Sequence, residues 1–118
     1  MHELSIAFYM VEQASTAARS QGARRVTRVQ ARVGVLSGVV KESLLFSWSV
    51  ATDSTLCQGA QLDIDDVPVT VRCPRCPPNA NVHTLSVPPR FRCPVCAEPT
   101  PELITGRELE IHSLEWQP

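Results

Sequence analysis

The sequence lacks several features that would each indicate a class of function. No segment approaches the roughly 18 consecutive apolar residues that a membrane span requires. The formal net charge of the 118 residues is −1, which argues against a nucleic-acid binder that relies on a strongly basic surface. Paired carboxylates, a serine–histidine arrangement and a phosphate-binding loop are also missing. We therefore do not expect an enzyme.

The first ten residues, MHELSIAFYM, contain no Lys or Arg, whereas a signal peptide begins with positive charge. We therefore expect a cytoplasmic, reducing location. Cysteines in that environment are more often metal ligands or catalytic thiols than disulfides.

Proline and cysteine are concentrated in one part of the chain. Nine of the ten prolines and four of the five cysteines lie between Pro68 and Pro101. With 43% hydrophobic and 19% charged residues, the chain as a whole is not disordered by composition. The uneven distribution predicts two structural regions rather than one.

Apolar residues at helical spacing predict two helices. The first runs from Leu4 to about Gly22, and the second begins at Lys41 after a loop at Gly34–Gly38. The expected buried positions are Leu4, Ala7, Phe8, Val11, Ala14 and Ala18 in the first helix, and Leu44, Leu45, Trp48 and Ala51 in the second.

Three segments alternate between apolar and polar residues and are predicted to be strands: Arg25–Val33, Ala60–Asp66 and Gly106–His112. Their polar faces are complementary, because the first carries Arg28 and Arg32 and the other two carry acids. If these strands are neighbours, ion pairs across them contribute roughly a few tenths of a kcal/mol each.

Together these elements predict an α+β fold, in which a small three-stranded sheet has two helices on one face. We expect residues 1–70 to form this domain, completed by the C-terminal strand at residues 103–118. Residues 71–102 are then an inserted zinc-ribbon-like domain.

The inserted segment contains Cys73-Pro74-Arg75-Cys76 and, sixteen residues later, Cys93-Pro94-Val95-Cys96. Two such turns supply the four thiolates of a tetrahedral structural Zn²⁺ site. Four thiolates close the site, so the zinc is expected to be structural. The segment has few apolar residues and is not expected to build a core of its own, so metal binding has to supply its folding free energy.

Disulfides and a redox pair are the alternatives for these cysteines. Disulfides conflict with a reducing location, and the proline-rich residues after each motif do not start the helix that a thioredoxin-like site requires. His83 could replace one of the ligands, but four cysteines already fill a tetrahedron, so we interpret it as a solvated loop residue. Cys57 is interpreted as a small buried residue.

A second candidate metal site is Met1-His2-Glu3. We expect the initiator Met to be retained before the bulky His2, which leaves a free α-amine. The amine, the imidazole and the backbone amides can chelate one ion, with Glu3 adding an amide or a carboxylate, and such nitrogen-rich sites suit Ni(II) or Cu(II). A histidine near a terminus is more often part of a mobile end. Glu42, at the start of the second helix, would lie near this site if that helix packs beside it.

Four features occur in order along essentially the whole chain: MHELS at the start, the loop with Gly34, Leu36, Ser37, Gly38 and Val39, the double CPxC motif, and Gly106-Arg107-Glu108-Leu109. Their combination resembles the HypA/HybF family of hydrogenase nickel-incorporation proteins.

The resemblance implies a metallochaperone with two metal sites. Nickel is its cargo, held by His2 as principal ligand with the Met1 amine and Glu3 as companions, and a structural zinc is bound by Cys73, Cys76, Cys93 and Cys96. It also implies delivery of nickel to the large subunit of [NiFe]-hydrogenase, with a nickel-handling GTPase partner of the HypB type. The short insertion would also permit exchange of domains between two chains, so a homodimer is a further expected partner.

The sequence departs from the zinc-knuckle pattern at one position in each motif. A glycine often follows the second cysteine so that a backbone N–H can approach a sulfur. Here Pro77 and Ala97 stand at these positions, and Pro77 has no N–H to donate.

The alternative function is a zinc-ribbon module that binds nucleic acid or another protein. Arg72, Arg75, Arg90 and Arg92 flank the two motifs, with Phe91 among them. A single aromatic residue and a net charge of −1 disfavour nucleic acid. A CxxC oxidoreductase is a third, weaker candidate.

Overall fold

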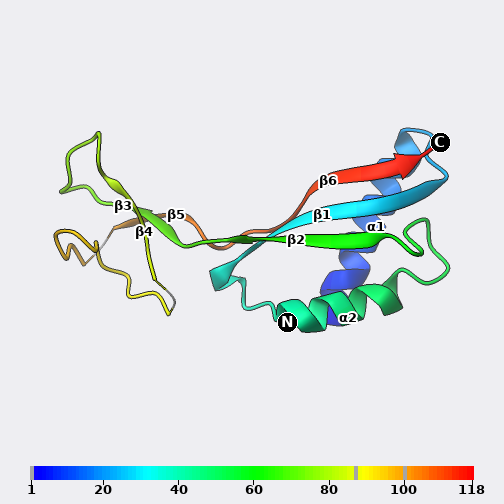
Figure 1. Cartoon of the computed structure of the whole chain (residues 1–118), viewed down its shortest axis with the longest axis horizontal. Helices are drawn as coiled ribbons and strands as arrows, with labels where there is room; N and C mark the ends of the chain where they lie inside the picture. The colour runs from blue at the N-terminus through cyan, green and yellow to red at the C-terminus, as the bar shows by residue number, and fades with distance from the viewer. Residues whose placement is uncertain (1, 87, 100) are drawn as a thin grey trace.

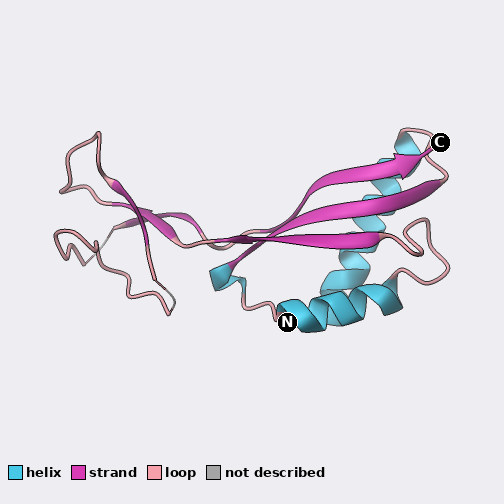
Figure 2. Cartoon of the chain, in the orientation of Figure 1, coloured by secondary structure: helices cyan, strands magenta, loops and turns pink. Residues whose placement is uncertain are grey.

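Two three-stranded sheets lie towards opposite ends of an elongated molecule with extents of 52 × 27 × 16 Å (Figure 1). The computed structural model describes residues 2–86, 88–99 and 101–118. Both long helices lie beside the first sheet, whereas loops make up most of the region around the second (Figure 2).

Both predicted helices are present. Helix α1 spans Glu3–Ser20, and the chain turns after it at Gly22, whose φ of +80° is a left-handed conformation that glycine adopts readily. Helix α2 spans Lys41–Ala51. Between the first strand and α2, the expected loop contains one turn of 3₁₀ helix, η1, at Val35–Ser37.

The buried face of each helix differs in part from the predicted one. Leu4 and Phe8 are 42% and 51% exposed, and Ile6 and Met10 are buried in their place. Leu45 in α2 is also exposed. Because α1 packs against α2 as well as against the sheet, its buried arc is set by the position of both neighbours, and helical spacing alone does not give that position.

The first sheet has the strand order β2-β1-β6, with β1 (Arg25–Gly34) in the centre. Strand β2 (Gln61–Val67) runs parallel to β1, and β6 (Leu109–Gln117) runs antiparallel to it. The parallel pair is joined through α2, because parallel neighbours need a long crossover connection. The predicted α+β class, with a three-stranded sheet and two helices, is confirmed.

The two faces of this sheet differ sharply in polarity. One face packs on α1 and α2 around a core that includes Val26, Val29, Leu44 and Trp48. The opposite face carries the predicted ion pairs across the strands, which are confirmed. The pairs are Arg28 with Asp63 (3.2 Å), Arg28 with Glu115 (3.4 Å) and Arg32 with Glu110 (3.7 Å). These polar contacts help to fix the order of the three strands.

Strand β6 begins three residues later than predicted and continues well beyond His112. Its pairing with β1 shifts register between Gln30 and Ala31, where Ser113 and Ile111 are the partners. This irregularity breaks the simple alternation of the sequence. Beyond it, Leu114 packs against the same core.

The second sheet was not predicted as strands. Its order is β4-β3-β5, formed by Val82–Thr84, Thr70–Arg72 and Glu102–Thr105, and all pairings are antiparallel. A small core of Val69, Val71 and Leu85 is buried there, with Leu36 and Leu103 packed against it. The expectation that this region has no core of its own was therefore wrong.

Strand β5 also affects the expected domain ranges. The division into 1–70, 71–102 and 103–118 stays a prediction, but its last boundary divides β5, which pairs with β3 in the second sheet. The three residues of β5 after Glu102 therefore belong with the second sheet rather than with the C-terminal strand. The alternation of apolar and polar residues predicted no strand in this segment before Gly106, so the pairing of these residues with β3 was not foreseen.

The glycine loop and the Gly106-Arg107-Glu108 motif meet where the chain passes between the two sheets. The backbone N–H of Gly34 donates to the carbonyl of Glu108 (2.7 Å), and that of Leu36 donates to the carbonyl of Gly106 (2.7 Å). The backbones lie so close that a Cβ atom at Gly34 would overlap the carbonyl group of Gly106. A glycine is thus required at position 34 for steric reasons.

We predict that Gly34→Ala destabilises the protein by about 3 kcal/mol, because neither backbone can move without breaking these hydrogen bonds. The midpoint of thermal unfolding should fall by roughly 10 °C. Gly38→Ala is the control, since Gly38 has φ +78° and no atom near its Cβ position, so its cost is about 1 kcal/mol from conformation alone. Equal losses in the two variants would contradict the steric explanation.

Candidate metal centres

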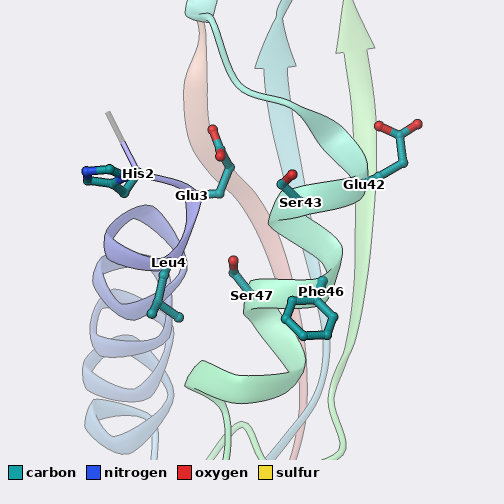
Figure 3. A pocket seen from close by; sticks show the side chains of 7 residues that line it. All are labelled: His2, Glu3, Leu4, Glu42, Ser43, Phe46 and Ser47. Atoms are coloured by element: carbon teal, nitrogen blue, oxygen red, sulfur yellow. The ribbon is translucent and has the colours of Figure 1, made fainter.

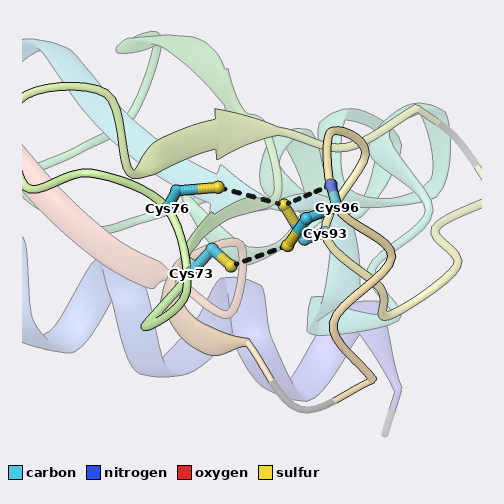
Figure 4. A group of neighbouring side chains, drawn as sticks. All are labelled: Cys73, Cys76, Cys93 and Cys96. Atoms are coloured by element: carbon cyan, nitrogen blue, oxygen red, sulfur yellow. Dashed lines mark hydrogen bonds between the residues drawn. The ribbon is translucent and has the colours of Figure 1, made fainter.

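The four cysteines of the double CPxC motif converge at the end of the second sheet (Figure 4). Cys73 directly follows β3, and its N–H donates to the carbonyl of Asn81 (2.8 Å). The sulfur of Cys73 lies 3.4 Å from that of Cys96, and the sulfur of Cys76 lies 3.6 Å from that of Cys93. All four sulfurs lie within 4.8 Å of one another.

This arrangement fits a four-coordinate metal ion. A Zn–S distance of about 2.3 Å in a tetrahedron corresponds to roughly 3.8 Å between sulfurs, close to the spacing of the two nearest pairs. Among the described residues, these four cysteines are the one group of His, Cys, Asp or Glu whose ligand atoms come this close together.

Cys93 lies in an environment that favours a thiolate. Burial by itself would raise its pKa, but the backbone N–H groups of Cys96 and Val95, at 3.5 and 3.4 Å from the sulfur, help to lower the pKa of Cys93 to about 6. The pKa of Cys76 is instead raised to about 12 by burial and by its three neighbouring thiols. A metal ion that binds here therefore has to displace protons from the cluster.

We call the two CPxC turns, Cys73–Cys76 and Cys93–Cys96, the first and second knuckle. They differ in the backbone N–H groups that reach their sulfurs, as their sequences suggest. In the described part of the chain, the backbone N–H groups that reach a sulfur all come from the second knuckle, and Pro77 has none to donate at the first. Ala97 takes the place of the frequent glycine and has a φ of +61°, the left-handed conformation that glycine would adopt without strain.

A salt bridge between the knuckles was not predicted. The Nε of Arg75 lies 2.7 Å from a carboxylate oxygen of Glu98, whose side chain is only 12% exposed. The pair connects the first CPxC turn to the segment that follows the second. The sequence shows only an arginine inside one CPxC motif and an acid just after the other. It does not show that they are close, because their proximity depends on the four sulfurs coming together.

Cys57 and His83 lie outside the group of four. Cys57 is buried in the first domain, with its sulfur 3.7 Å from the hydroxyl of Ser15, and burial raises the pKa of its thiol. The Nε2 atom of His83 is buried and has no hydrogen-bond partner among the described residues, so this histidine is not the solvated loop residue that we expected. Its strand β4 pairs with β3, which precedes Cys73.

The predicted nickel motif lies at the start of α1. His2 is exposed and has the extended backbone of an N-cap residue (φ −86°, ψ 131°), and Glu3 is the first residue of the helix. Met1 lies outside the described residues. His2 and Glu3 line an open depression of about 460 Å³ together with Glu42 of α2. The side chains of His2 and Glu42 point away from each other in this structure (Figure 3).

We compared the chain with models of known protein families. The family model described as "Hydrogenase/urease nickel incorporation, metallochaperone, hypA" matches residues 1–116. The chain belongs to the HypA family. The family is one of metallochaperones that act in hydrogenase maturation and nickel incorporation rather than a family of enzymes.

Curated HypA relatives match over nearly their whole length. The chain is 49% identical to the hydrogenase maturation factor HypA of Chloroflexus aurantiacus over 98% of each chain. It is 44% identical to that of Roseiflexus sp., covering 99% of this chain and 93% of the other.

The fold matches as well. The solution structure of the nickel metallochaperone HypA from Helicobacter pylori has a TM-score of 0.70 at 25% identity, and the match covers 98% of this chain and 97% of that one. None of the helices within the described residues is both long and apolar enough to span a bilayer.

We predict that Cys73→Ser abolishes stoichiometric binding of zinc, because three thiolates cannot close the tetrahedron. The core at the second sheet has three buried apolar residues among those that the structure describes, so this region should then become sensitive to protease while the first domain stays resistant. Elemental analysis and limited proteolysis measure the two effects. Cys57→Ser is the matched control and should keep its zinc; full zinc content in Cys73→Ser would contradict the assignment.

A second variant tests the second knuckle. Ala97→Gly should relieve the left-handed strain and stabilise the metal-bound state by roughly 1 kcal/mol, seen as tighter zinc retention against a competing chelator. Ala80→Gly is the control, because Ala80 is also exposed and lies in the same domain but is not among the residues with positive φ. This variant should not retain zinc more tightly. An unchanged or lower zinc affinity in Ala97→Gly would show that the backbone at this position is not strained.

Proposed function

We propose that this protein binds Ni(II) at its N-terminus and delivers it for maturation of the large subunit of [NiFe]-hydrogenase. Delivery would involve a nickel-handling GTPase partner of the HypB type. The observation that carries the proposal is the family match over residues 1–116, which includes the Met1-His2-Glu3 motif. In this proposal His2 is the principal ligand, and the Met1 amine and Glu3 are its companions.

The local backbone supports a chelate at this position. The first N–H groups of a helix have no partner within the helix, and the ladder of α1 begins only with the N–H of Ile6, which donates to the carbonyl of His2 (3.2 Å). The amides of His2 and Glu3 can therefore bind a metal without breaking helical hydrogen bonds. Because amides and imidazole must lose protons to bind, such a site releases its metal on acidification.

We further propose that Cys73, Cys76, Cys93 and Cys96 hold a structural Zn²⁺. The sulfur spacing and the thiolate-favouring environment of Cys93 support zinc in preference to a hard, oxygen-seeking ion. When bound, the ion cross-links two loops whose own apolar contacts are few. In this proposal, the structural zinc occupies the closed site of four cysteines, and the nickel that is transferred occupies the open site at the N-terminus.

The nucleic-acid alternative loses much of its basis in the fold. Of the four flanking arginines, Arg72 pairs with Glu102 (3.5 Å) and Arg75 with Glu98 (2.7 Å). Arg90 and Arg92 remain exposed beside Phe91, which is 49% exposed. Two arginines and one aromatic side chain are a small platform for stacking and backbone contacts with a single strand.

The cytoplasmic location and the homodimer stay predictions.

We predict that His2→Ala lowers the Ni²⁺ affinity of the full-length protein at least a hundredfold in calorimetry, because it removes the imidazole ligand. Zinc content and thermal stability should be unchanged, since His2 is exposed and its side chain caps no helical N–H. His112→Ala, which removes another exposed histidine on β6, is the matched control and should bind nickel normally.

Native mass spectrometry of the wild-type protein after addition of Ni²⁺ should give one zinc and one nickel per chain. Undiminished nickel affinity in His2→Ala would refute the assignment of the site. A protein without bound nickel that instead binds a single-stranded oligonucleotide in a salt-dependent way would favour the zinc-ribbon alternative.

A further inference from the structure

Four of the large apolar side chains that are exposed on α1 and α2 line cavities beside the two helices. They are Leu4 and Phe8 on α1, and Phe46 and Val50 on α2, with exposed fractions of 42%, 51%, 73% and 48%. Within each helix the two residues are four positions apart and therefore lie on one face, one turn from each other. We call the surface that they line the helix groove.

The helix groove is a real depression between the two helices. Its first part, of about 460 Å³, is lined by Leu4 and Phe46, and its second part, of about 890 Å³, by Phe8 and Val50. On each helix, the apolar residue that lines the second part comes four positions after the one that lines the first, which is about one helical turn. The buried residues Val11, Ser15, Ser47 and Ala51 line its depth.

The shape of the helix groove suits another helix. The N-terminal residues of α1 share the first part with the N-terminal half of α2, and later residues of α1 share the second part with the C-terminal end of α2. From His2 to Arg19 the α1 wall is about 25 Å long, which corresponds to four or five helical turns. Walls with apolar side chains at i and i+4 accept the ridge of a packed helix.

The charges around the helix groove have mainly one sign. Glu3 and Glu42 line its first part, and Glu12 and Asp53 line its second, whereas Arg19 is the one Lys or Arg among the described residues that line either part. Within the part of the chain that the structure describes, none of these four carboxylates forms an ion pair. In contrast, acids on the polar face of the first sheet are paired with arginines.

We propose that the helix groove docks an amphipathic helix of a partner protein, with an apolar stripe and Lys or Arg residues on its flanks. The groove opens directly beside His2 and Glu3, so a helix seated in it would hold its parent protein next to the proposed nickel site. That role in nickel transfer rests on the proposed function, whereas docking itself rests on the helix groove.

A second copy of this chain is a poor occupant. A two-fold interface through this surface would bring the same acidic rims of two grooves together, and like charges in contact oppose association. A basic helix would instead pair with the unpartnered carboxylates at both ends while its apolar stripe covers Phe46, Phe8 and their neighbours.

The test uses the full-length, zinc-loaded protein and a fluorescein-labelled 18-residue helical peptide with leucines at i, i+3, i+4 and i+7 and lysines on its flanks. Fluorescence anisotropy at low salt should show saturable binding to the wild-type protein. Phe46→Ser should weaken it at least tenfold. Val95→Ser, which alters an equally exposed apolar residue in the zinc domain, should leave it unchanged. A peptide with glutamates in place of the lysines should bind at least tenfold more weakly.

Three results would overturn the proposal: no binding of the lysine-flanked peptide, equal binding by the Phe46→Ser and Val95→Ser variants, or no preference between the two peptides. Sedimentation that shows a wild-type dimer lost in Phe46→Ser would assign the groove to a second copy instead. The result is separable from the nickel assignment, because Phe46→Ser removes none of the proposed nickel ligands and should keep its nickel affinity. A Phe46→Ser variant that loses nickel would show that the groove is not a separate docking surface.

Discussion

The close contact between Gly34 and Gly106 is the constraint on which the arrangement of the two halves depends. At this point the end of β1 meets the segment that leads from β5 into β6, and the backbone hydrogen bonds of Gly34 and Leu36 hold them together. Leu36 then reaches the core of the second sheet, so the small zinc-binding region is anchored by the first domain as well as by its own strands. A larger residue at the crossing would separate the two.

The two candidate metal sites make opposite physical demands, and the fold meets them at different places. Four thiolates that converge between two loops make a closed site, in which hydrogen bonds to Cys93 and the Arg75–Glu98 salt bridge favour one arrangement. The N-terminus of α1 offers an exposed imidazole and helix amides without partners. A closed sulfur site suits a permanent metal, and an open terminal site suits one that is passed on.

The distribution of charge separates surfaces that stabilise the fold from the surface that we propose for docking. On the outer face of the first sheet, Arg28 and Arg32 meet acids on both neighbouring strands. Along the helix groove the carboxylates form no ion pair with any described residue, and the apolar side chains between them are exposed. Exposed apolar surface and unpaired charge both cost free energy in an isolated chain, and a complementary partner removes both costs.

The sequence by itself determined the helices, the three strands of the first sheet and the cysteine set, because each depends on local periodicity or spacing. It also indicated the ion pairs of Arg28, since strand faces follow from alternation. Only the tertiary structure decided that Leu4 and Phe8 are exposed, that β5 pairs with β3, and that Arg75 meets Glu98. These features depend on where distant segments pack, and a helix with apolar residues around much of its circumference does not reveal which arc its neighbours cover.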